Sequence, residues 1–181
     1  MRMGLGKDVA YEYAQIYDDS NVIMNVTFMK QKLFTKSAFK VALTCPRQLY
    51  YYGDESYANQ NNDDSFLMAL AEGGFQVGEL AKIYYGVDDA NDIKEKDYQS
   101  SINVTNERLK LSDVNIAEAA FRYKDCFVRV DILKKTGTDI ELVEVKAKSW
   151  TEEDSFLNKK GEVASGIREY LYDVAFQKWV V

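Results

Sequence analysis

The residues best suited to chemistry lie in two neighbouring segments in the second half of the chain. Asp131 lies within the segment 127–134, and Glu144 and Lys146 follow in the segment 140–148. Both segments are expected to be strands, joined by a turn into an antiparallel hairpin. Because alternate side chains of a strand share a face, Glu144 and Lys146 are expected on the same side of the sheet.

The length of the turn decides how close the two carboxylates lie. With a four-residue loop, 136–139, Asp131 is directly opposite Glu144, whereas with a two-residue loop, 136–137, Asp131 faces Leu142 and Glu144 is diagonal on the same face. Only an odd number of loop residues would separate the two acids. Like charges this close are unfavourable by up to about 1 kcal/mol on an exposed sheet, so a cation must offset them.

The sequence leaves the identity of that cation open. Lys146 could form a purely structural ion pair with Glu144. Alternatively, Asp131, Glu144 and the backbone carbonyl of Val145 could hold a hard divalent ion, Mg²⁺ or Mn²⁺, which prefers oxygen ligands. Lys146 would then orient or deprotonate an attacking water and stabilise the extra negative charge of a pentacovalent phosphate.

These residues resemble a known family. Asp131, followed thirteen positions later by Glu144-Val145-Lys146, resembles the core motif of the PD-(D/E)XK nuclease superfamily, which is an Asp and then (Asp/Glu)-x-Lys. Other segments resemble the RecB-like branch and a bacterial group in which this module precedes a further domain. They are Cys-Pro-Arg at 45–47, Gly-Phe-Gln-Val-Gly-Glu at 74–79, and the Gln-containing segment 170–177.

The resemblance implies a metal-dependent deoxyribonuclease, exonuclease-like, with Mg²⁺ or Mn²⁺ as its cofactor and DNA as its partner. It implies that Glu79 is a further metal ligand, although Gly78 stands where this branch usually has His. It also implies that Gln177 lines the active site and that Tyr170 contacts nucleic acid. No iron–sulfur cluster is expected, because the chain has only one cysteine besides Cys45.

A basic strip supplies candidate contacts to phosphate groups. From residue 21 to residue 53 the chain contains no acidic residue, and such a strip is either a solvated face or a docking face. The candidate nucleic-acid contacts are Lys36, Lys40 and Arg47 in the strip, and Lys148 beyond the Glu-x-Lys motif.

Two further residues lie close to the motif in the expected hairpins. Arg129 shares a face with Asp131 and is either a phosphate contact or a salt-bridge partner of Glu144. Glu118 belongs to the preceding strand and could approach the site if its side chain lies on the same face.

Composition excludes several other mechanisms. The 181 residues include no histidine, which removes Ser-His-Asp and Cys-His catalysis, and the two cysteines are too few for a four-cysteine zinc site. The net charge of −6 argues against a protein that coats nucleic acid nonspecifically. No apolar run approaches the ~18 residues of a membrane span and no signal peptide is evident, so no membrane partner and a cytoplasmic location are expected.

The order of elements predicts an α/β (α+β) fold. We expect a central mixed sheet that contains an antiparallel meander and is flanked by helices. The resemblance implies that this sheet is a restriction-endonuclease-like core. The expected helices are 38–43, 47–52, 65–85, 98–111 and 165–181, and the expected strands are 116–123, 127–134 and 140–148.

Local signals predict where several helices begin and end. Thr35 or Ser37 could cap the first helix, which should end at Cys45 before the single proline. Ser165 could cap the last helix. The helix 65–85 is expected to bury one stripe of apolar side chains. The stripe consists of Phe66, Leu70, Val77 and Leu80.

The chain lacks a linker that would divide it into two folded domains. Residues 1–33 are expected to form an N-terminal arm or helix, and residues 34–181 the nuclease-like domain. Because Val181 closes the chain inside or just after the last helix, one interpretation is a fragment of a longer protein with a further C-terminal domain. A competing interpretation of function is a catalytically inactive nucleic-acid-binding or scaffold module with the same fold.

Overall fold

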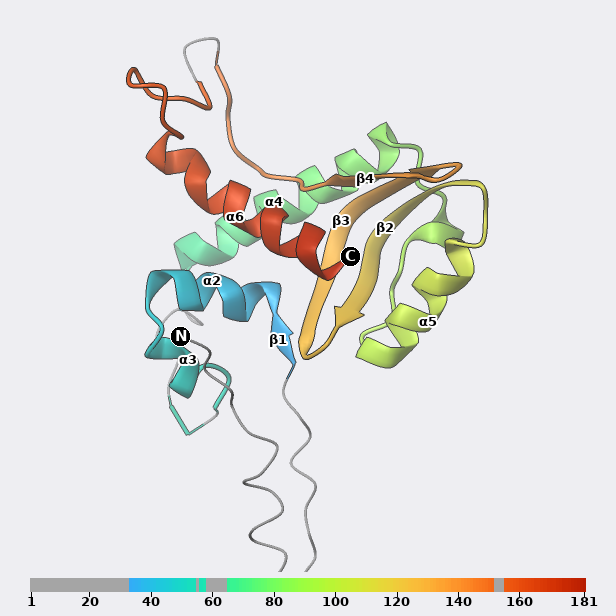
Figure 1. The fold of residues 1–181 in the computed structure, drawn as a ribbon, viewed down its shortest axis with the longest axis horizontal. Helices are drawn as coiled ribbons and strands as arrows, with labels where there is room; N and C mark the ends of the chain where they lie inside the picture. The colour runs from blue at the N-terminus through green and yellow to red at the C-terminus, as the bar shows by residue number, and fades with distance from the viewer. Residues whose placement is uncertain (1–32, 55, 58–64, 152–154) are drawn as a thin grey trace, which may run out of the picture. The chain divides into compact units, whose positions relative to one another are not determined.

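The computed structural model describes residues 33–54, 56–57, 65–151 and 155–181. Residues 1–32, which include nearly all of the expected N-terminal arm, lie outside the described residues. The described part is a mixed sheet flanked by helices, as the sequence predicts (Figure 1).

The sheet is built on an antiparallel meander with one short parallel strand added. Strand β3 is central, and it pairs with β2 and β4 in antiparallel fashion and with β1 in parallel fashion. The expected meander is therefore confirmed. The strands are β1 (Phe34–Thr35), β2 (Asp113–Tyr123), β3 (Cys126–Thr136) and β4 (Asp139–Val143).

The two edges of β3 are occupied differently. β2 pairs with β3 along its whole length, whereas β1 and β4 share the opposite edge. β1 pairs with the start of β3, as far as Phe127, and β4 pairs with its end, from Ile132 onward. No described strand pairs with residues 128–131 on this edge. Three segments converge at this gap: the exit of β1, the middle of β3 and the exit of β4.

The helices lie beside different strands. α5 contacts β2, whereas α2, α4 and α6 contact β3 (Figure 1). None of the described helices has the length and apolar character that a membrane span requires. The described helices are α2 (Lys36–Thr44), α3 (Gln48–Tyr51), α4 (Ser65–Tyr84), α5 (Tyr98–Arg108) and α6 (Ser165–Val180), and a 3₁₀ turn, η1 (Asp89–Asn91), precedes α5.

A side-chain cap marks the start of α2 but not that of α6. Of the two candidates for the first helix, Thr35 is the N-cap, and its side-chain oxygen accepts a hydrogen bond from the Ala38 amide at 3.3 Å. Lys36 is therefore the first residue of α2, directly after β1. The expected cap at Ser165 is wrong, because Ser165 is already inside α6 and the N-cap is Ala164, which has no side-chain oxygen.

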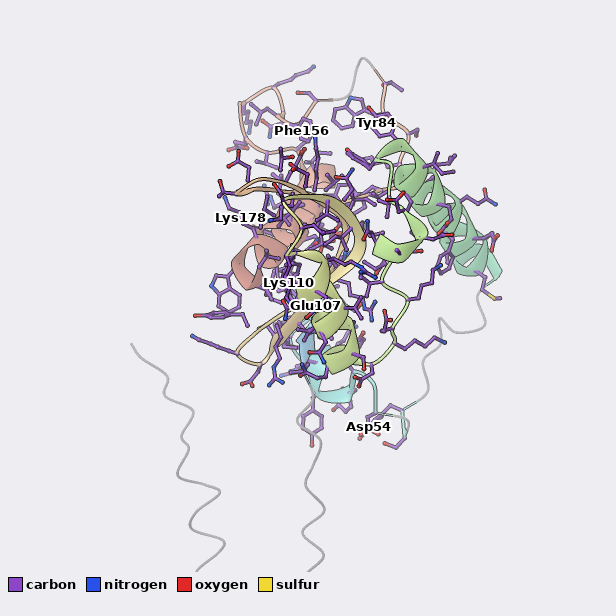
Figure 2. All side chains as sticks on the ribbon, turned by 90° about the vertical axis from the view of Figure 1, so that its right-hand side faces the viewer. Asp54, Tyr84, Glu107, Lys110, Phe156 and Lys178 are labelled. Carbon is purple, nitrogen blue, oxygen red and sulfur yellow. The ribbon has the colours of Figure 1, made fainter. Side chains whose placement is uncertain are left out.

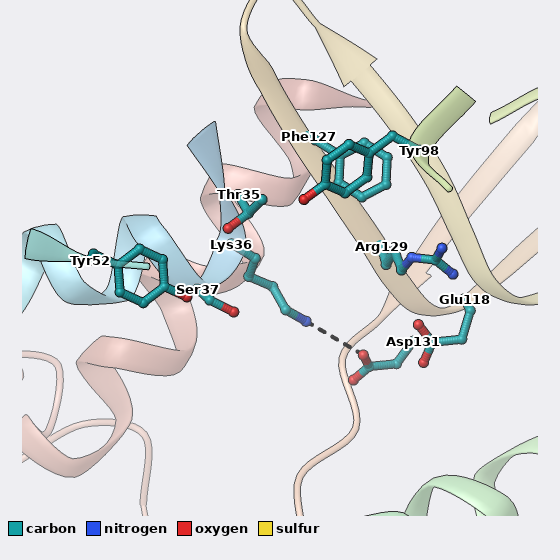
Figure 3. Close-up of a pocket in the computed structure, with 9 residues that line it drawn as sticks. All are labelled: Thr35, Lys36, Ser37, Tyr52, Tyr98, Glu118, Phe127, Arg129 and Asp131. Atoms are coloured by element: carbon teal, nitrogen blue, oxygen red, sulfur yellow. Dashed lines mark hydrogen bonds and ion pairs between the residues drawn. The ribbon is translucent and has the colours of Figure 1, made fainter. Parts of the chain in front are cut away.

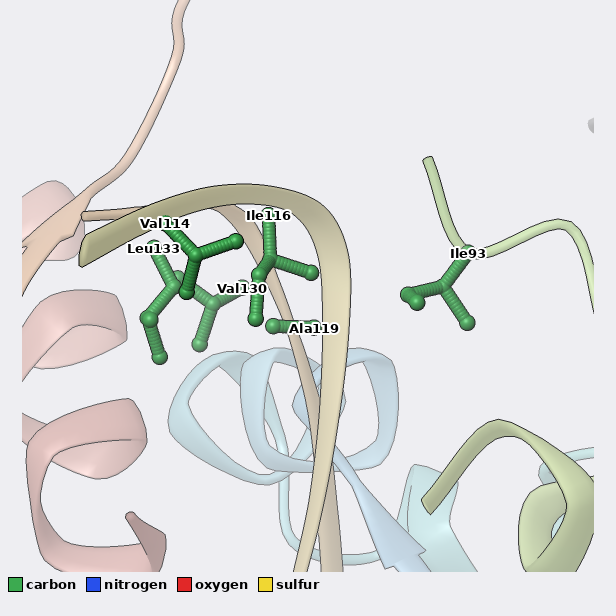
Figure 4. Packing of buried hydrophobic residues seen from close by; sticks show 6 residues of the cluster. All are labelled: Ile93, Val114, Ile116, Ala119, Val130 and Leu133. Atoms are coloured by element: carbon green, nitrogen blue, oxygen red, sulfur yellow. The ribbon is translucent and has the colours of Figure 1, made fainter. Parts of the chain in front are cut away.

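Two apolar clusters hold the elements together. One lies around β2 and β3 and includes Ile93 from the segment before α5 (Figure 4). The other joins α2 and α6 to the start of β3, where the rings of Phe39 and Phe176 stack with centroids 4.5 Å apart. The buried members of the first cluster are Ile93, Val114, Ile116, Ala119, Val130 and Leu133.

The outer face of α5 is polar, as expected for a helix that packs on one side only. Glu107, in its last turn, and Lys110, just beyond its end, lie next to one another in Figure 2 and form an ion pair of 2.7 Å. On the inner side of α5, the buried Thr105 hydroxyl donates to the Ser101 carbonyl and accepts from the Ala120 amide of β2.

The expected buried stripe of α4 is wrong. Leu70 and Leu80 have 56% and 64% of their surface exposed, and Val77 is only half-buried. The side chain of Phe66 lies outside the described residues. The physical reason is that α4 does not press its apolar residues against the sheet but lines a cleft with small ones, as described below.

Candidate functional site

The two acids predicted from the hairpin lie together at the gap in the edge of β3. Lys135 pairs with Ile140, which is the register of the four-residue alternative, and continuing it puts Asp131 opposite Glu144. Gly137 has a φ of +58° in the turn, a conformation that glycine adopts without strain. The carboxylates of Asp131 and Glu144 both contact the ammonium group of Lys36, so the prediction that they lie on the same side of the hairpin is confirmed.

The strand β4 ends at Val143, earlier than the expected strand 140–148, because a hydrogen bond to a side chain takes the place of backbone pairing beyond that point. Pairing stops at Ile132 and Val143, one pair before Asp131 and Glu144. There, Asp131 Oδ2 accepts a hydrogen bond from the Val145 amide at 2.8 Å. Glu144 and the residues after it leave the ladder and are held by side chains instead.

A lysine from the start of α2 lies between the two carboxylates. Lys36 Nζ is 3.1 Å and 3.2 Å from the two oxygens of Glu144 and 3.5 Å from Oδ1 of Asp131. In Figure 3 its side chain extends from α2 to Asp131. The sequence singled out Lys36 as a phosphate contact, whereas here its ammonium group is the cation that offsets the two acids.

Two more donors hold the carboxylate of Glu144, whose side chain is only 5% exposed. Lys146 Nζ donates to Oε1, and the amide nitrogen of Gln177 donates to Oε2 at 2.6 Å. The structure thus brings four of the predicted residues, Asp131, Glu144, Lys146 and Gln177, into one network.

Burial and neighbouring charges act in opposite directions on the pKa of each group. Burial is the largest single influence on Glu144 and raises its pKa, but the hydrogen bond from Lys146 and the charge of Lys36 outweigh it, so the pKa is lowered. For both lysines burial is again the largest influence and lowers the pKa. The neighbouring carboxylates outweigh it, so the pKa values of Lys36 and Lys146 are raised above that of an ordinary lysine. Both lysines are therefore cations at neutral pH.

Sequence reasoning missed Asp173, which anchors two lysines of the site. Its side chain is 1% exposed, and it accepts from Lys40 Nζ at 2.9 Å and Lys146 Nζ at 3.3 Å. Lys40, predicted as a phosphate contact, is therefore ion-paired. Asp173 and Gln177 are four residues apart on α6, so helical spacing could have placed them on one face.

Glu79 lines the same cleft but is not in contact with the hairpin acids. Its side chain is 70% exposed and pairs with Lys82 at 2.7 Å, and Lys82 also pairs with Asp92 at 3.1 Å. Within the ranges that the structure describes, no three metal-ligating side chains converge into a ready-made metal site. The structure therefore does not bring Glu79 together with Asp131 and Glu144, and its role as a metal ligand stays a prediction.

The cleft itself lies between α4 and the gap in the sheet edge and has a volume of about 790 Å³. On the α4 side it is lined by small residues, Ala71, Gly74 and Gly78, together with Phe75. Three lysines outside the acid network line it as well, namely Lys82, Lys94 and Lys96.

A smaller cavity of about 390 Å³ adjoins Lys36 and Asp131. The aromatic side chains of Tyr52, Tyr98 and Phe127 line it (Figure 3).

Glu118 lines both cavities beside Asp131 (Figure 3). The β2–β3 pairing is interrupted between Ala117 and Ala119, and Glu118 has a φ of +54°, which is unfavourable for a residue with a side chain. Burial, followed by the charge of Asp131, raises the pKa of Glu118. The pairs on either side of Glu118 keep the same register, which puts Glu118 opposite Asp131. A third carboxylate thus lies beside the site, an outcome that the sequence left open.

The remaining candidates lie around this network. Lys148 and Lys146 lie over the ring of Tyr170, with Nζ 5.5 Å and 5.7 Å from its centroid. Arg47 is exposed just before α3 and lines neither of the two cavities at the acids. Arg129 donates to the backbone carbonyls of Ile93 and Glu95, so it has a structural role.

The donor set fits one hard divalent cation. Mg²⁺ in proteins uses one or two carboxylates and keeps several waters, and Asp131 and Glu144 supply two carboxylates around a position where the structure already has a cationic group. Val145 lines the cleft, and its amide donates a hydrogen bond to Asp131.

Comparisons of the chain with protein-family models, with curated proteins and with solved structures found no match.

Proposed function

We propose that this chain is a metal-dependent nuclease of the PD-(D/E)XK type, with a restriction-endonuclease-like core, that hydrolyses phosphodiester bonds in DNA. One observation carries the proposal: the carboxylates of Asp131 and Glu144 surround a single cation position at the edge of an open cleft. Lys146 donates a hydrogen bond to the Glu144 carboxylate beside this position. Mg²⁺ or Mn²⁺ bound there would polarise a phosphate oxygen and lower the pKa of a bound water.

The residues of the chain then have distinct roles. Asp131 and Glu144 hold the metal, and Gln177 fixes the orientation of the Glu144 carboxylate through its hydrogen bond of 2.6 Å. Because the pKa of Lys146 is raised, we assign this lysine to orienting the water and stabilising the extra negative charge of the phosphate, not to removing a proton. Water attack forms one phosphorus–oxygen bond and breaks the phosphorus–oxygen bond to the sugar. The attacking water gives its proton to solvent, and the leaving sugar oxygen takes up one proton from solvent.

The basic side chains around the cleft support a polyanionic substrate. Lys82, Lys94 and Lys96 line it, and Lys148 lies beside the site over Tyr170. An exonuclease-like action and a preference for DNA follow from the family resemblance.

One observation favours a second candidate function. Lys36 already offsets the charge of Asp131 and Glu144, which is the arrangement a catalytically inactive nucleic-acid-binding module would need to stay folded without a metal. Such a module would bind DNA in the cleft but not cleave it.

A cleavage assay separates the two functions. The wild-type protein is incubated with labelled single- and double-stranded DNA, and with RNA, in Mg²⁺ and in Mn²⁺. Asp131→Asn and Lys146→Met are each expected to reduce the rate by at least about 100-fold. Glu141→Gln, which changes an exposed carboxylate of β4, is the matched control and is expected to cleave like the wild type.

The possible outcomes are distinct. Equal cleavage by the wild type, Asp131→Asn and Lys146→Met would show that the activity comes from a contaminant, and the nuclease proposal would then be rejected. Binding of DNA by the wild type without turnover in either metal would support the inactive module. Cleavage of RNA alone would change the proposed substrate and leave the proposed chemistry intact.

A further inference from the structure

We propose that Lys36 is a built-in competitor for the divalent cation, so that the site exchanges one cation for another. In the absence of metal its ammonium group occupies the position between Asp131 and Glu144, and metal binding displaces it from both acids. This inference rests on the proposed function, because it presumes that the same two carboxylates bind a metal.

A metal ion bound to both acids would have to lie at or next to the present position of the Lys36 ammonium group. Lys36 Nζ lies 3.1 Å to 3.5 Å from an oxygen of each carboxylate. Mg²⁺ binds oxygen at about 2.0–2.1 Å, so an ion that touches both carboxylates would lie against the ammonium group. The two positive charges would repel each other strongly at that separation. Lys36 and the metal therefore cannot both hold Asp131 and Glu144.

Lys36 is the lysine of this network that is free to leave. Lys146 contacts Asp173 as well as Glu144, and Lys40 is paired with Asp173, which is 1% exposed. Among the described residues, the ion pairs of Lys36 are with Asp131 and Glu144 only. Losing these two acids to a metal thus removes the partners of Lys36 but leaves Lys146 and Lys40 anchored.

The structure offers space for the displaced side chain. The cavity of about 390 Å³ beside Asp131 is lined by Lys36 itself, by Thr35 and Ser37, and by Arg129 (Figure 3). The backbone of Lys36 stays fixed by the capped start of α2, so only the side chain has to move. A displaced ammonium group would remain next to the metal position, where it can contact a phosphate group of the substrate. Metal would then bind before DNA.

Chemical labelling of the wild-type protein tests the displacement without a mutation. Lysines are acetylated at limiting acetic anhydride with and without Mn²⁺, and the rate at each position is read by mass spectrometry. The side chain of Lys36 is 22% exposed and hydrogen-bonded, and we expect its labelling rate to rise at least about threefold on saturation with Mn²⁺, whereas the rate at Lys110, just after α5, stays unchanged. An unchanged or lower rate at Lys36 in saturating Mn²⁺ would overturn the proposal.

Metal affinity tests the competition directly. The dissociation constant for Mn²⁺ is measured by calorimetry and by electron paramagnetic resonance. Lys36→Met is expected to bind Mn²⁺ at least about tenfold more tightly than the wild type, because no internal cation has to be displaced. Lys40→Met removes the same charge from the same helix but from a lysine that contacts Asp173, so its dissociation constant should change by less than about threefold.

The result also distinguishes this proposal from the proposed function. Equal tightening in Lys36→Met and Lys40→Met would be general electrostatics and would overturn the competition. If the wild type binds Mn²⁺ and Lys36→Met binds it no better, the competitor role fails and the nuclease proposal stands. If neither protein binds Mn²⁺, the metal site and the competition both fail. Should Lys36→Met not fold, as judged by circular dichroism, the labelling of the wild type decides the question.

Discussion

Glu118 is the acid of the site whose ionisation the fold opposes most clearly. Burial raises its pKa, and the charge of Asp131 raises it further, whereas the charges of Arg129, Lys36 and Lys82 only partly compensate. A carboxyl with a raised pKa binds its proton more tightly in the folded protein than in the unfolded chain. It is protonated in both states at low pH and costs stability only when the pH exceeds the pKa of an ordinary glutamic acid.

We therefore expect Glu118→Gln to be more stable than the wild type at pH 7–8, with a difference that vanishes near pH 4. As the pH rises from 4, the unfolded wild type loses its proton first, so its free energy of unfolding falls until the raised pKa is passed. The variant has no such loss. Urea unfolding at several pH values measures the difference between the two proteins.

Glu141→Gln serves as the control, because Glu141 is an exposed carboxylate on β4. A stability difference between Glu118→Gln and the wild type that stays constant from pH 4 to pH 8 would contradict the expected titration.

The sequence allowed part of this site to be predicted residue by residue. Strand alternation and turn length placed Asp131 and Glu144 together, because both depend on local geometry. Lys36 could not be assigned to the same acids, because it lies 95 positions before Asp131 and reaches it only through tertiary packing. Glu118 could be assigned to the preceding strand, but the face of its side chain stayed open, and no local pattern signals its positive φ.

At the scale of elements, α4 forms one wall of the cleft with glycines instead of packing tightly. A side-chain carbon added at Gly73, Gly74 or Gly78 would meet no atom within 4 Å. Gly78 lines the cleft, whereas Gly73 does not, although both lie on the same helix. The two positions thus form a matched pair for testing the cleft.

We expect Gly78→Leu to fill the cleft and weaken DNA binding at least about tenfold, whereas Gly73→Leu leaves binding within about twofold of the wild type. Both variants replace a glycine inside a helix and should gain up to about 1 kcal/mol in free energy of unfolding. Fluorescence anisotropy with labelled DNA measures binding, and thermal unfolding measures stability. Equal weakening by both variants would mean that the cleft is not the binding surface.

The existence and order of the elements could be predicted from the sequence more fully than their packing. Helix ends such as the stop of α2 at Cys45 before the proline follow from local backbone chemistry. The end of β4 does not, because it depends on a hydrogen bond between Val145 and Asp131 across the hairpin. The exposed face of α4 was also unpredictable, since an apolar stripe indicates a partner but not whether that partner is present.

At the scale of the whole molecule, an aromatic contact holds together the helices α2, which supplies Lys36 and Lys40, and α6, which supplies Asp173 and Gln177. Phe39 of α2 stacks on Phe176 of α6, and Phe176 is 9% exposed and packs on the cluster around Val128 of β3. Because Phe176 immediately precedes Gln177, this contact also fixes the position of the Glu144 network relative to α2.

We expect Phe176→Ala to lower the free energy of unfolding by about 3–5 kcal/mol, the range for removing a buried phenylalanine side chain. Leu171→Ala, on an exposed part of the same helix, should cost less than about 1 kcal/mol. Urea unfolding measures both. Similar losses in the two variants would show that the stack does not dock α2 against α6.

The edge of β3 that β1 and β4 share also has a consequence for the order in which the molecule folds. The β3–β4 hairpin joins residues close in sequence and is expected to form early, whereas Lys36 has to close a loop of 95 residues to reach it. Until then Lys146 is the nearby counter-charge of Glu144, and the counter-charge of Lys36 is missing. Lys36→Met should consequently speed unfolding and leave the folding rate nearly unchanged in stopped-flow measurements. The docking of α2 as the last step of folding would also bring Lys36 into contact with Asp131 and Glu144.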